Sequence, residues 1–264
     1  MKKKNSPRIV TIDIETSPLL VQTWGIWEQN VLLENIKRDW TILSFCAKWM
    51  DDDKVIYRDT GGRGVNKVFD DKGLVKELRD ILDEADIVIG QNHKSFDIKK
   101  INSRILEHKI APYSPIKVVD TKIVAKKNFA FTSNKLAFMT EKLTKIKKDK
   151  HKHFPGMDLW NECMAENPKA WAEMKKYNIL DVLATEELYL LMRPWVEGHP
   201  NMAVYSEVET PACPKCGSEK IQKRGEAVTQ TGRYHRFQCQ DCSGWSRSRY
   251  VTNTKEKRKS LLSN

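Results

Sequence analysis

The order of strand and helix patterns along residues 8–193 constrains the fold of this chain more than any other feature of its sequence. Three strand-like segments come first, at residues 8–15, 40–49 and 54–58, and sequential strands of this kind are expected to form an antiparallel meander. Helical and strand-like segments then follow one another, with helices expected at 72–85, 96–108, 135–143 and 168–193, and buried strands at 86–90 and 116–120. This order predicts an α/β fold in which helices cover both sides of a mixed sheet.

Four carboxylates and a tyrosine stand where these elements would bring them to one point. Alternation along the first strand puts Asp13 and Glu15 on one face, opposite its apolar residues. Asp97 falls in the first turn of a helix, and Tyr177 and Asp181 share one helix face because they are four residues apart. Taken singly, each has an ordinary explanation, such as a solvated sheet face or a charge near a helix start. Together their oxygens would suit Mg²⁺ or Mn²⁺, and two such ions about 4 Å apart can cleave a phosphodiester.

Three short motifs carry a resemblance to a known family. They are Asp13-Ile14-Glu15-Thr16, Gly90-Gln91-Asn92 followed by Phe96-Asp97, and Tyr177-Asn178-Ile179-Leu180-Asp181. In this order, residues 8–195 resemble the DEDD superfamily of 3′–5′ exonucleases in its tyrosine-bearing (DEDDy) branch. The second motif has the form seen in the proofreading domains of family B DNA polymerases. The resemblance implies a ribonuclease H-like fold and 3′–5′ exonuclease activity.

The resemblance also implies which residues hold the metal ions. Asp13, Glu15 and Asp181 would bind the ion beside the attacking water, and Asp13 would bridge to a second ion. Asp97 would hold that second ion. The expected cofactors of this site are therefore two Mg²⁺ or Mn²⁺ ions.

Neighbouring residues would complete the site. By the same resemblance, Tyr177 would orient the nucleophilic water, and Asn92 and Phe96 would bind substrate beside Asp97. Asp120 also ends a predicted strand, but a hydrogen bond to a turn explains a carboxylate at that position equally well. We therefore do not place Asp120 in the acidic cluster.

Two Cys-x₂-Cys pairs separated by 22 residues predict a zinc ribbon near the C-terminus. A module this small needs its metal in order to fold. Cys46 and Cys163 stand alone and are expected to be buried as small apolar residues. The expected ligands of one Zn²⁺ ion are Cys213, Cys216, Cys239 and Cys242.

The formal charge of +11 is concentrated in the C-terminal part of the chain. Residues 211–264 hold 12 Lys and Arg against 4 Asp and Glu, which accounts for +8 of this charge and indicates a polyanionic partner. Aromatic residues interleave with these arginines, so the ribbon is expected to bind nucleic acid by phosphate contacts and base stacking. One alternative is that Phe237 and Trp245 simply form the small core of the ribbon. Another is that the ribbon docks a protein partner.

The predicted domains are a ribonuclease H-like exonuclease domain over residues 1–205, a zinc ribbon over 206–252 and a basic, disordered tail over 253–264. A run of basic residues from Lys142 to His153 either flanks the substrate channel or is a solvated loop. The histidines in this run are not expected to bind metal.

The predicted function is metal-dependent 3′–5′ exonuclease activity on single-stranded DNA 3′ ends, with a polymerase or another replication protein as a partner. Two alternatives stay open: an exoribonuclease with the same site, because the carboxylates do not select the sugar, or a non-catalytic adaptor that binds nucleic acid. No stretch approaches the roughly 18 apolar residues of a membrane span, and the basic start lacks the apolar stretch of a secretory signal. A cytoplasmic location is therefore expected.

Overall fold

The computed structural model of this chain describes residues 6–262. One compact unit spans Arg8–Tyr189, and a second comprises the described residues from Leu190 onward together with Ser6 and Pro7. The predicted domain limits at 205 and 252 stay predictions. Residues 1–5 and 263–264, at the ends of the predicted first domain and tail, lie outside the described part of the chain.

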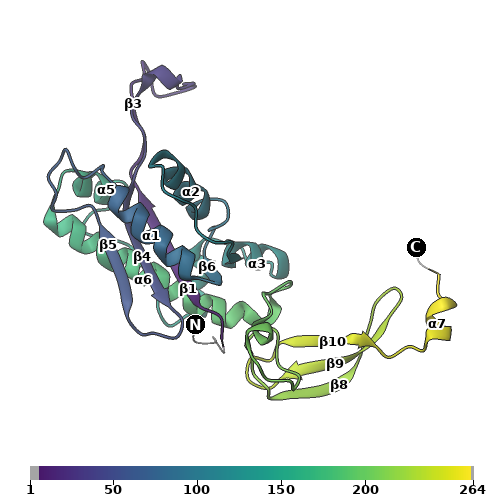
Figure 1. Cartoon of the computed structure of the whole chain (residues 1–264). Helices are drawn as coiled ribbons and strands as arrows, with labels where there is room; N and C mark the ends of the chain where they lie inside the picture. The colour runs from purple at the N-terminus through teal and green to yellow at the C-terminus, as the bar shows by residue number, and fades with distance from the viewer. Residues whose placement is uncertain (1–5, 263–264) are drawn as a thin grey trace. The chain divides into compact units, whose positions relative to one another are not determined.

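The first unit is built on a five-stranded mixed sheet (Figure 1). Its strands are β1 (Ile9–Thr16), β4 (Ile42–Trp49), β5 (Val55–Asp59), β6 (Ile87–Gly90) and β7 (Lys117–Asp120). The strand order is β5-β4-β1-β6-β7. The pairs β1–β4 and β4–β5 are antiparallel, which confirms the predicted meander, while β6 runs parallel to both β1 and β7.

Helices cover both faces of this sheet, as the sequence predicts. They are α1 (Lys72–Glu84), α2 (Asp97–Glu107), α3 (Thr121–Asn128), α4 (Leu136–Leu143), α5 (Asp158–Met164) and α6 (Pro168–Met192). On one face, α1 and α2 pack against Ile12, Ile14 and Phe45 (Figure 1). On the other, α5 and α6 pack around Leu43 and Leu159. The predicted α/β fold is therefore confirmed.

The sequence patterns do not predict α3 and α5. Each has at most eight residues, and its apolar positions form no helical repeat that stands out in the sequence. In α5 only Leu159 and Cys163 are buried. Both helices depend on contacts with the rest of the unit rather than on a strong local signal.

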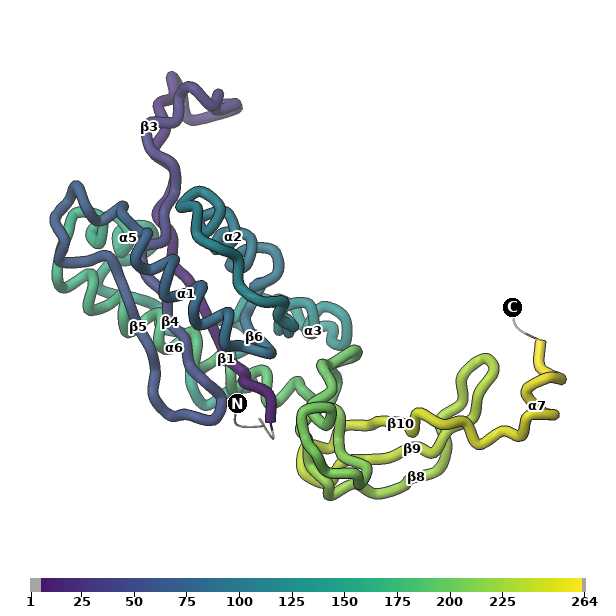
Figure 2. Tube along the Cα trace, viewed as in Figure 1, coloured from purple at the N-terminus to yellow at the C-terminus, as the bar shows by residue number. Residues whose placement is uncertain are grey.

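A two-stranded arm, which the sequence patterns also do not predict, leaves the end of β1 and returns to β4 (Figure 2). It consists of β2 (Leu20–Val21), the 3₁₀ turn η1 (Leu33–Asn35) and β3 (Ile36–Arg38). Its apolar side chains point into solvent, since Trp24, Ile26, Trp27 and Leu33 are each at least 83% exposed. The arm therefore adds no core to the unit.

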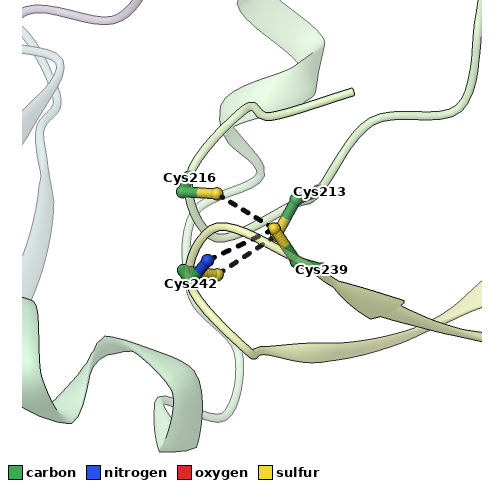
Figure 3. Close-up of side chains that lie close together, drawn as sticks. All are labelled: Cys213, Cys216, Cys239 and Cys242. Atoms are coloured by element: carbon green, nitrogen blue, oxygen red, sulfur yellow. Dashed lines mark hydrogen bonds between the residues drawn. The ribbon is translucent and has the colours of Figure 1, made fainter. Parts of the chain in front are cut away.

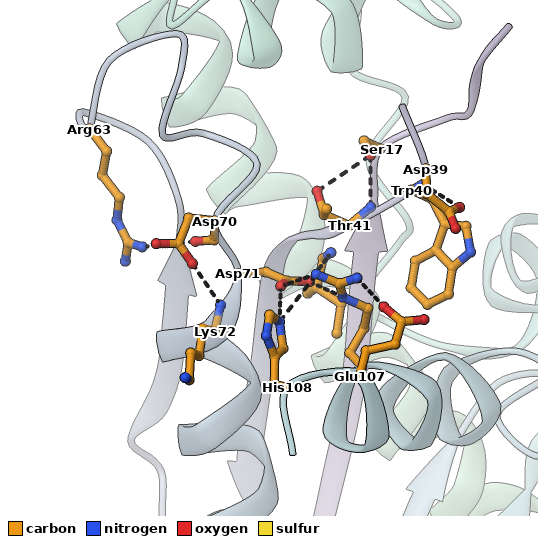
Figure 4. Close-up of polar contacts among 12 residues, drawn as sticks. Ser17, Asp39, Trp40, Thr41, Arg63, Asp70, Asp71, Lys72, Glu107 and His108 are labelled. Atoms are coloured by element: carbon orange, nitrogen blue, oxygen red, sulfur yellow. Dashed lines mark hydrogen bonds and ion pairs between the residues drawn. The ribbon is translucent and has the colours of Figure 1, made fainter. Parts of the chain in front are cut away.

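A buried ionic cluster joins α1, α2 and β4 (Figure 4). Asp71 is fully buried and accepts hydrogen bonds from the Ile42 amide at 2.9 Å and from Nε of Arg104 at 2.8 Å, and it lies 2.6 Å from Nε2 of His108. Burial alone would raise the pKa of Asp71, but these bonds hold it below its usual range. The cluster fixes the C-terminal end of α2, and thereby the helix whose first residue is Asp97.

The second unit contains a three-stranded antiparallel sheet in the order β10-β9-β8. Its elements are η2 (Arg193–Trp195), η3 (Met202–Tyr205), β8 (Ile221–Val228), β9 (Arg233–Cys239), β10 (Trp245–Val251) and α7 (Lys255–Lys259). The helix α7 lies in the segment expected to be disordered, and none of its five residues is buried. A helix this short is marginal by itself, so disorder of the tail stays a prediction. None of the helices in the described part of the chain is long and apolar enough to cross a membrane.

Candidate functional site

Three carboxylates from two elements meet on the α6 side of the sheet. Asp13 and Glu15 project from β1 away from Ile12 and Ile14, which pack on the opposite face. Asp181 projects from α6 and is 3% exposed. Oxygens of the three carboxylates all lie within 4.8 Å of one another. We call Asp13, Glu15 and Asp181 the acidic cluster.

Asp97 lies beside the acidic cluster rather than within it. It begins α2 and is 2% exposed. Its Oδ1 accepts a hydrogen bond from the amide of Ile14 at 3.1 Å, and its Oδ2 lies 3.4 Å from Nδ1 of the buried His93. The first of these bonds attaches the start of α2 to β1, at the residue between Asp13 and Glu15.

Asn178 orients one member of the acidic cluster, and the sequence patterns give it no role. Its Nδ2 donates a hydrogen bond to Oδ2 of Asp13 at 2.6 Å, and its Oδ1 accepts one from the hydroxyl of Ser44 at 3.3 Å. Asn178 is fully buried. It lies inside the third motif, directly after Tyr177, and that position is the only signal in the sequence that could have pointed to it.

Lys148 places an ammonium group against the acidic cluster. Its Nζ donates a hydrogen bond to the hydroxyl oxygen of Tyr177 at 2.7 Å and forms an ion pair with Asp181. The same nitrogen lies 4.0 Å from the centre of the Tyr177 ring. In the sequence, Lys148 is one of several lysines in a loop without periodicity, so its special position cannot be recognised there.

Two rings support Tyr177 from the side. The ring centroids of His151 and Trp160 lie 5.2 Å and 5.9 Å from that of Tyr177, both in edge-to-face contact. Nδ1 of His151 is 2.8 Å from the carbonyl oxygen of Phe154, and His151 is not among the groups of potential metal ligands in the described part of the chain. The packing holds the phenol in a fixed orientation at the edge of the acidic cluster.

Burial, and then the crowding of acidic groups, raises the pKa values in this site. For Glu15, burial is the main cause and the charge of Asp181 adds to it, which raises the pKa to about 8 although Lys148 opposes the change. Burial and the charges of Asp97 and Glu15 raise the pKa of Asp13. The pKa of Tyr177 is raised by burial and by the charges of Glu15 and Asp181, so its phenol keeps its proton.

The acidic cluster fits a divalent cation. One lysine faces three carboxylates, so negative charge remains uncompensated when all three are ionised. Oδ1 of Asp181 is buried and has no hydrogen-bond partner among the described residues. An orphaned carboxylate oxygen inside a cluster of acids is a ligand of the kind that Mg²⁺ or Mn²⁺ takes.

The residues expected to bind substrate lie on the loop before α2. Asn92 has a left-handed backbone (φ 62°), and its amide donates a hydrogen bond to Oδ1 of Asp120 at 3.0 Å. Asp120 also accepts a hydrogen bond from the amide of Lys94 and caps α3. Asp120 therefore holds the loop of the second motif in place. It does not belong to the acidic cluster, as predicted from the sequence.

A cavity of about 430 Å³ adjoins Glu15 at the base of the arm. Its walls include Trp40, Phe96 and Trp160. Nζ of Lys100 lies 3.7 Å from the centre of the Trp40 ring and 5.1 Å from that of Phe96. Aromatic walls with a cation between them suit a nucleobase and its phosphate. A larger cavity, of about 720 Å³ beside Phe154, contains none of the acidic cluster.

The four cysteines of the predicted ribbon form one group (Figure 3). Their sulfur atoms lie within 4.8 Å of one another, and none of them is in a disulfide. The Cys213–Cys242 and Cys216–Cys239 sulfur pairs are each 3.6 Å apart. A tetrahedral zinc site with Zn–S bonds of about 2.3 Å has sulfur atoms roughly 3.8 Å apart, so the spacing fits Zn²⁺.

Among these thiols, Cys239 has the electrostatics that metal binding favours, whereas burial raises the pKa of Cys213 and Cys216. The amide of Cys242 faces the sulfur of Cys239 at 3.5 Å. Burial opposes ionisation of Cys239, but amide hydrogens of Cys242 and Asp241 lower its pKa to about 7. A thiolate stabilised in this way is ready to bind metal.

Comparison with known proteins identifies the first unit. A family model described as the RNase H superfamily matches residues 35–193. The match includes Asp97, Tyr177 and Asp181 and begins after Asp13 and Glu15. No curated protein matches the chain.

Among solved structures, the fold is similar to that of a family B DNA polymerase from the hyperthermophilic archaeon Pyrobaculum calidifontis, with a TM-score of 0.55 and 16% sequence identity. The similarity covers 76% of this chain and 27% of the polymerase chain, so less than a third of that protein is represented. At this identity the likeness concerns the fold alone.

Proposed function

The chain belongs to the RNase H superfamily, and on this premise we propose that it is a metal-dependent 3′–5′ exonuclease acting on single-stranded DNA. The observation that carries the proposal is the acidic cluster, in which oxygens of Asp13, Glu15 and Asp181 lie within 4.8 Å of one another. Tyr177 and Asp97 border this cluster. The five residues are those of the three DEDDy-like motifs in the sequence.

Metal ions would be held by the carboxylates. Asp13, Glu15 and Asp181 would hold one Mg²⁺ or Mn²⁺, and Asp13 with Asp97 a second. Bound there, the two ions would activate the attacking water and stabilise the leaving oxygen of the phosphodiester. Asn178 would keep Asp13 turned toward the site through its 2.6 Å hydrogen bond. The raised pKa values of Asp13 and Glu15 support this assignment, because a bound divalent cation would stabilise carboxylate charges that burial and mutual repulsion disfavour.

Tyr177 would orient the water rather than remove its proton. Burial and nearby carboxylates raise its pKa, so the phenol stays neutral and donates a hydrogen bond. Its oxygen already accepts a hydrogen bond from Lys148, which leaves the phenol hydrogen for the water. The rings of His151 and Trp160 would hold this direction.

The cavity beside Glu15 would take the 3′-terminal nucleotide. Phe96 and Trp40 offer ring faces on which a base can stack, which requires that the base be unpaired. Single-stranded substrate follows from this requirement. The preference for DNA is supported by the resemblance of the second motif to family B polymerase proofreading domains and by the fold similarity to such a polymerase. The same likeness supports a DNA polymerase as the partner, so that the trimmed 3′ ends would be those of the DNA that the polymerase extends.

The cysteine group would hold one Zn²⁺ and make the second unit a zinc ribbon. The excess of positive charge in residues 211–264 supports a nucleic-acid-binding role for the ribbon. Four cysteines that stay reduced also suit the reducing cytoplasm, which is the location that we propose.

The proposal is tested on 5′-labelled single-stranded DNA and RNA of equal sequence, with Mg²⁺, Mn²⁺ or a chelator. We expect the DNA to shorten stepwise from its 3′ end, and the activity to disappear with chelator and in Asp13→Ala. Preferential degradation of RNA would instead establish an exoribonuclease. If the protein cleaves neither the DNA nor the RNA, or if Asp13→Ala stays fully active, the assigned site is wrong.

A further inference from the structure

One face of the ribbon sheet carries a row of three arginines, one from each strand. Arg236 of β9 lies directly opposite Arg247 of β10 in the strand register. On its other side, Nε of Arg236 donates a hydrogen bond to the carbonyl oxygen of Arg224 in β8 at 2.9 Å. All three residues are exposed. We call Arg224, Arg236 and Arg247 the arginine row.

Two aromatic rings flank the arginine row on the same face. The guanidinium carbon of Arg236 lies 4.9 Å from the centre of the Trp245 ring, and that of Arg247 lies 3.9 Å from the centre of the Tyr234 ring. Both distances are within reach of a cation–π contact. Trp245 is 44% exposed, so part of its ring surface is open to a ligand.

Phe237 and Trp245 do not form a shared core in the ribbon. Phe237 pairs with Ser246, the neighbour of Trp245, and successive side chains of a strand point to opposite faces. Phe237 and Trp245 therefore lie on opposite sides of the sheet. The alternative in which these two rings form one small core does not agree with this register.

The charge of the arginine row is not balanced within the protein. Like charges on neighbouring strands destabilise a sheet. In the part of the chain that the structure describes, no carboxylate pairs with any of the three guanidinium groups. Glu226, the acidic residue of this sheet, lies opposite His235 and pairs with Arg233 at 3.4 Å on the other face. An anionic ligand would offset the repulsion among the three guanidinium groups, which no carboxylate of the sheet relieves.

We propose that the arginine row, with Trp245 and Tyr234, is a binding site for single-stranded nucleic acid that does not depend on base sequence. Guanidinium groups would contact phosphates, and bases would stack on the two rings. Stacking requires unpaired bases, and contacts to phosphates and ring faces carry no sequence information. The inference deepens the proposed function, because it assigns the ribbon the task of holding the strand that the first unit trims.

The test measures binding of a dye-labelled 30-nucleotide poly(dT) by fluorescence anisotropy, with the full-length, zinc-loaded chain. An Asp13→Ala background prevents cleavage under the proposed function and leaves the ribbon unchanged. The test variant carries Arg224→Ala, Arg236→Ala and Arg247→Ala. The control carries Lys223→Ala, Lys257→Ala and Lys259→Ala, which removes the same charge from exposed positions outside the row. Zinc content and circular dichroism check that each variant is folded.

We expect the arginine variant to lose at least about tenfold in affinity. The slope of log Kd against the logarithm of salt concentration should fall by roughly 2, as expected for three lost phosphate contacts on a single strand. Trp245→Ala should weaken binding by about tenfold, a typical value for one lost stacking contact. The lysine control should bind within about twofold of the parent protein, because its charges lie outside the proposed site.

Equal losses in both triple variants would overturn the proposal, since binding would then follow overall charge. Full binding by the arginine variant, or no binding by the parent protein at low salt, would also overturn it, and the latter would favour a protein as the ligand of this face. Because no cleavage is measured, failure of this site is distinguishable from failure of the nuclease assignment. A chain that binds through the row but never cleaves would retain this inference and lose the proposed function.

Discussion

Lys148 balances only part of the charge that Asp13, Glu15 and Asp181 gather at the end of β1. It also bonds the hydroxyl of Tyr177, so one side chain links the proposed water-orienting group to a proposed metal ligand. We predict that Lys148→Met lowers the exonuclease rate by about 10- to 100-fold, since hydrogen bonds to charged groups contribute roughly 1.5–3 kcal/mol. Single-turnover cleavage of a short oligonucleotide measures this.

The matched control is Lys150→Met, which removes an exposed lysine two residues away in the same loop. Its rate should stay within about twofold of the unaltered protein, because an exposed charge contributes little. Equal rates for the two variants would show that the contact of Lys148 with the acidic cluster has no part in the reaction.

The raised pKa of Glu15 makes stability depend on pH. Its pKa is about 8 in the folded protein against an ordinary 4.5, so the folded state keeps a proton that the unfolded chain releases in this window. The free energy of unfolding therefore falls as pH rises from about 4.5 to about 8. Without added Mg²⁺ or Mn²⁺, the melting temperature should be lower at about pH 8.5 than at about pH 5.5.

Two further measurements isolate the cause. Added Mn²⁺ should raise the melting temperature more at the higher pH, where metal ions do not compete with protons. Glu15→Gln should flatten the dependence of the melting temperature on pH, because the substitution removes the ionisable carboxyl group. A melting temperature that rises steadily over this range in the unaltered protein would contradict the electrostatic description of the cluster.

At the residue scale, local periodicity predicts some positions and misses others. Asp13 and Glu15 share a strand face, and Tyr177 and Asp181 share a helix face, by rules that need only a few neighbouring residues. Lys148 reaches the site from a loop, and its position depends on long-range packing that no local pattern encodes. Asn178, Trp160 and Lys100 lie on helices, but their contacts with the site also depend on long-range packing.

At the scale of elements, the arm formed by β2 and β3 is the least integrated part of the first unit. A two-stranded hairpin is only marginally stable in water, and the large apolar residues at its tip are exposed. We predict that replacing residues 22–35 by a short Gly-Ser turn changes the melting temperature by less than about 2 °C, corresponding to less than about 1 kcal/mol.

Thermal unfolding followed by circular dichroism measures this prediction. Binding of a hydrophobic dye should fall in the shortened protein, because Trp24, Ile26 and Trp27 are removed. The double variant Trp24→Ser and Trp27→Ser serves as a control that keeps the backbone of the arm. A loss of more than about 5 °C on shortening would mean that the arm contributes to the core.

The long helix α6 was predicted closely, whereas several short elements were missed. The helix α6 has 25 residues, and its start and end differ from the predicted ones by one residue at most. The helices α3 and α5 and the arm give no comparable signal: the helices are short, and β2 and β3 have only two and three residues. Their existence depends on β7, α6 and the turn after β1, which lie beyond any local window.

At the scale of the whole molecule, the division into two units makes the zinc site separable from the acidic cluster. We predict about one zinc ion per chain in protein purified under reducing conditions, and near-complete loss of zinc in Cys213→Ser, because a three-ligand site binds the ion much more weakly. Elemental analysis measures the zinc, and limited proteolysis should then cut within residues 206–252.

Cys163→Ala is the matched control, since Cys163 is a buried thiol in the core of the first unit. It should keep its zinc and resist proteolysis in the ribbon. Zinc that stays bound in Cys213→Ser, or that is absent from the unaltered reduced protein, would contradict a four-cysteine site.

Direct analysis of cleavage products tests the central claim, that the acidic cluster removes nucleotides from a 3′ end. With Mn²⁺ and single-stranded DNA labelled on its 3′-terminal nucleotide, the account predicts that the first product is a labelled mononucleotide. It also predicts that Asp181→Asn slows this step on the order of 10²–10³-fold while zinc content is unchanged. Labelled fragments longer than one nucleotide, or full activity in Asp181→Asn, would contradict it.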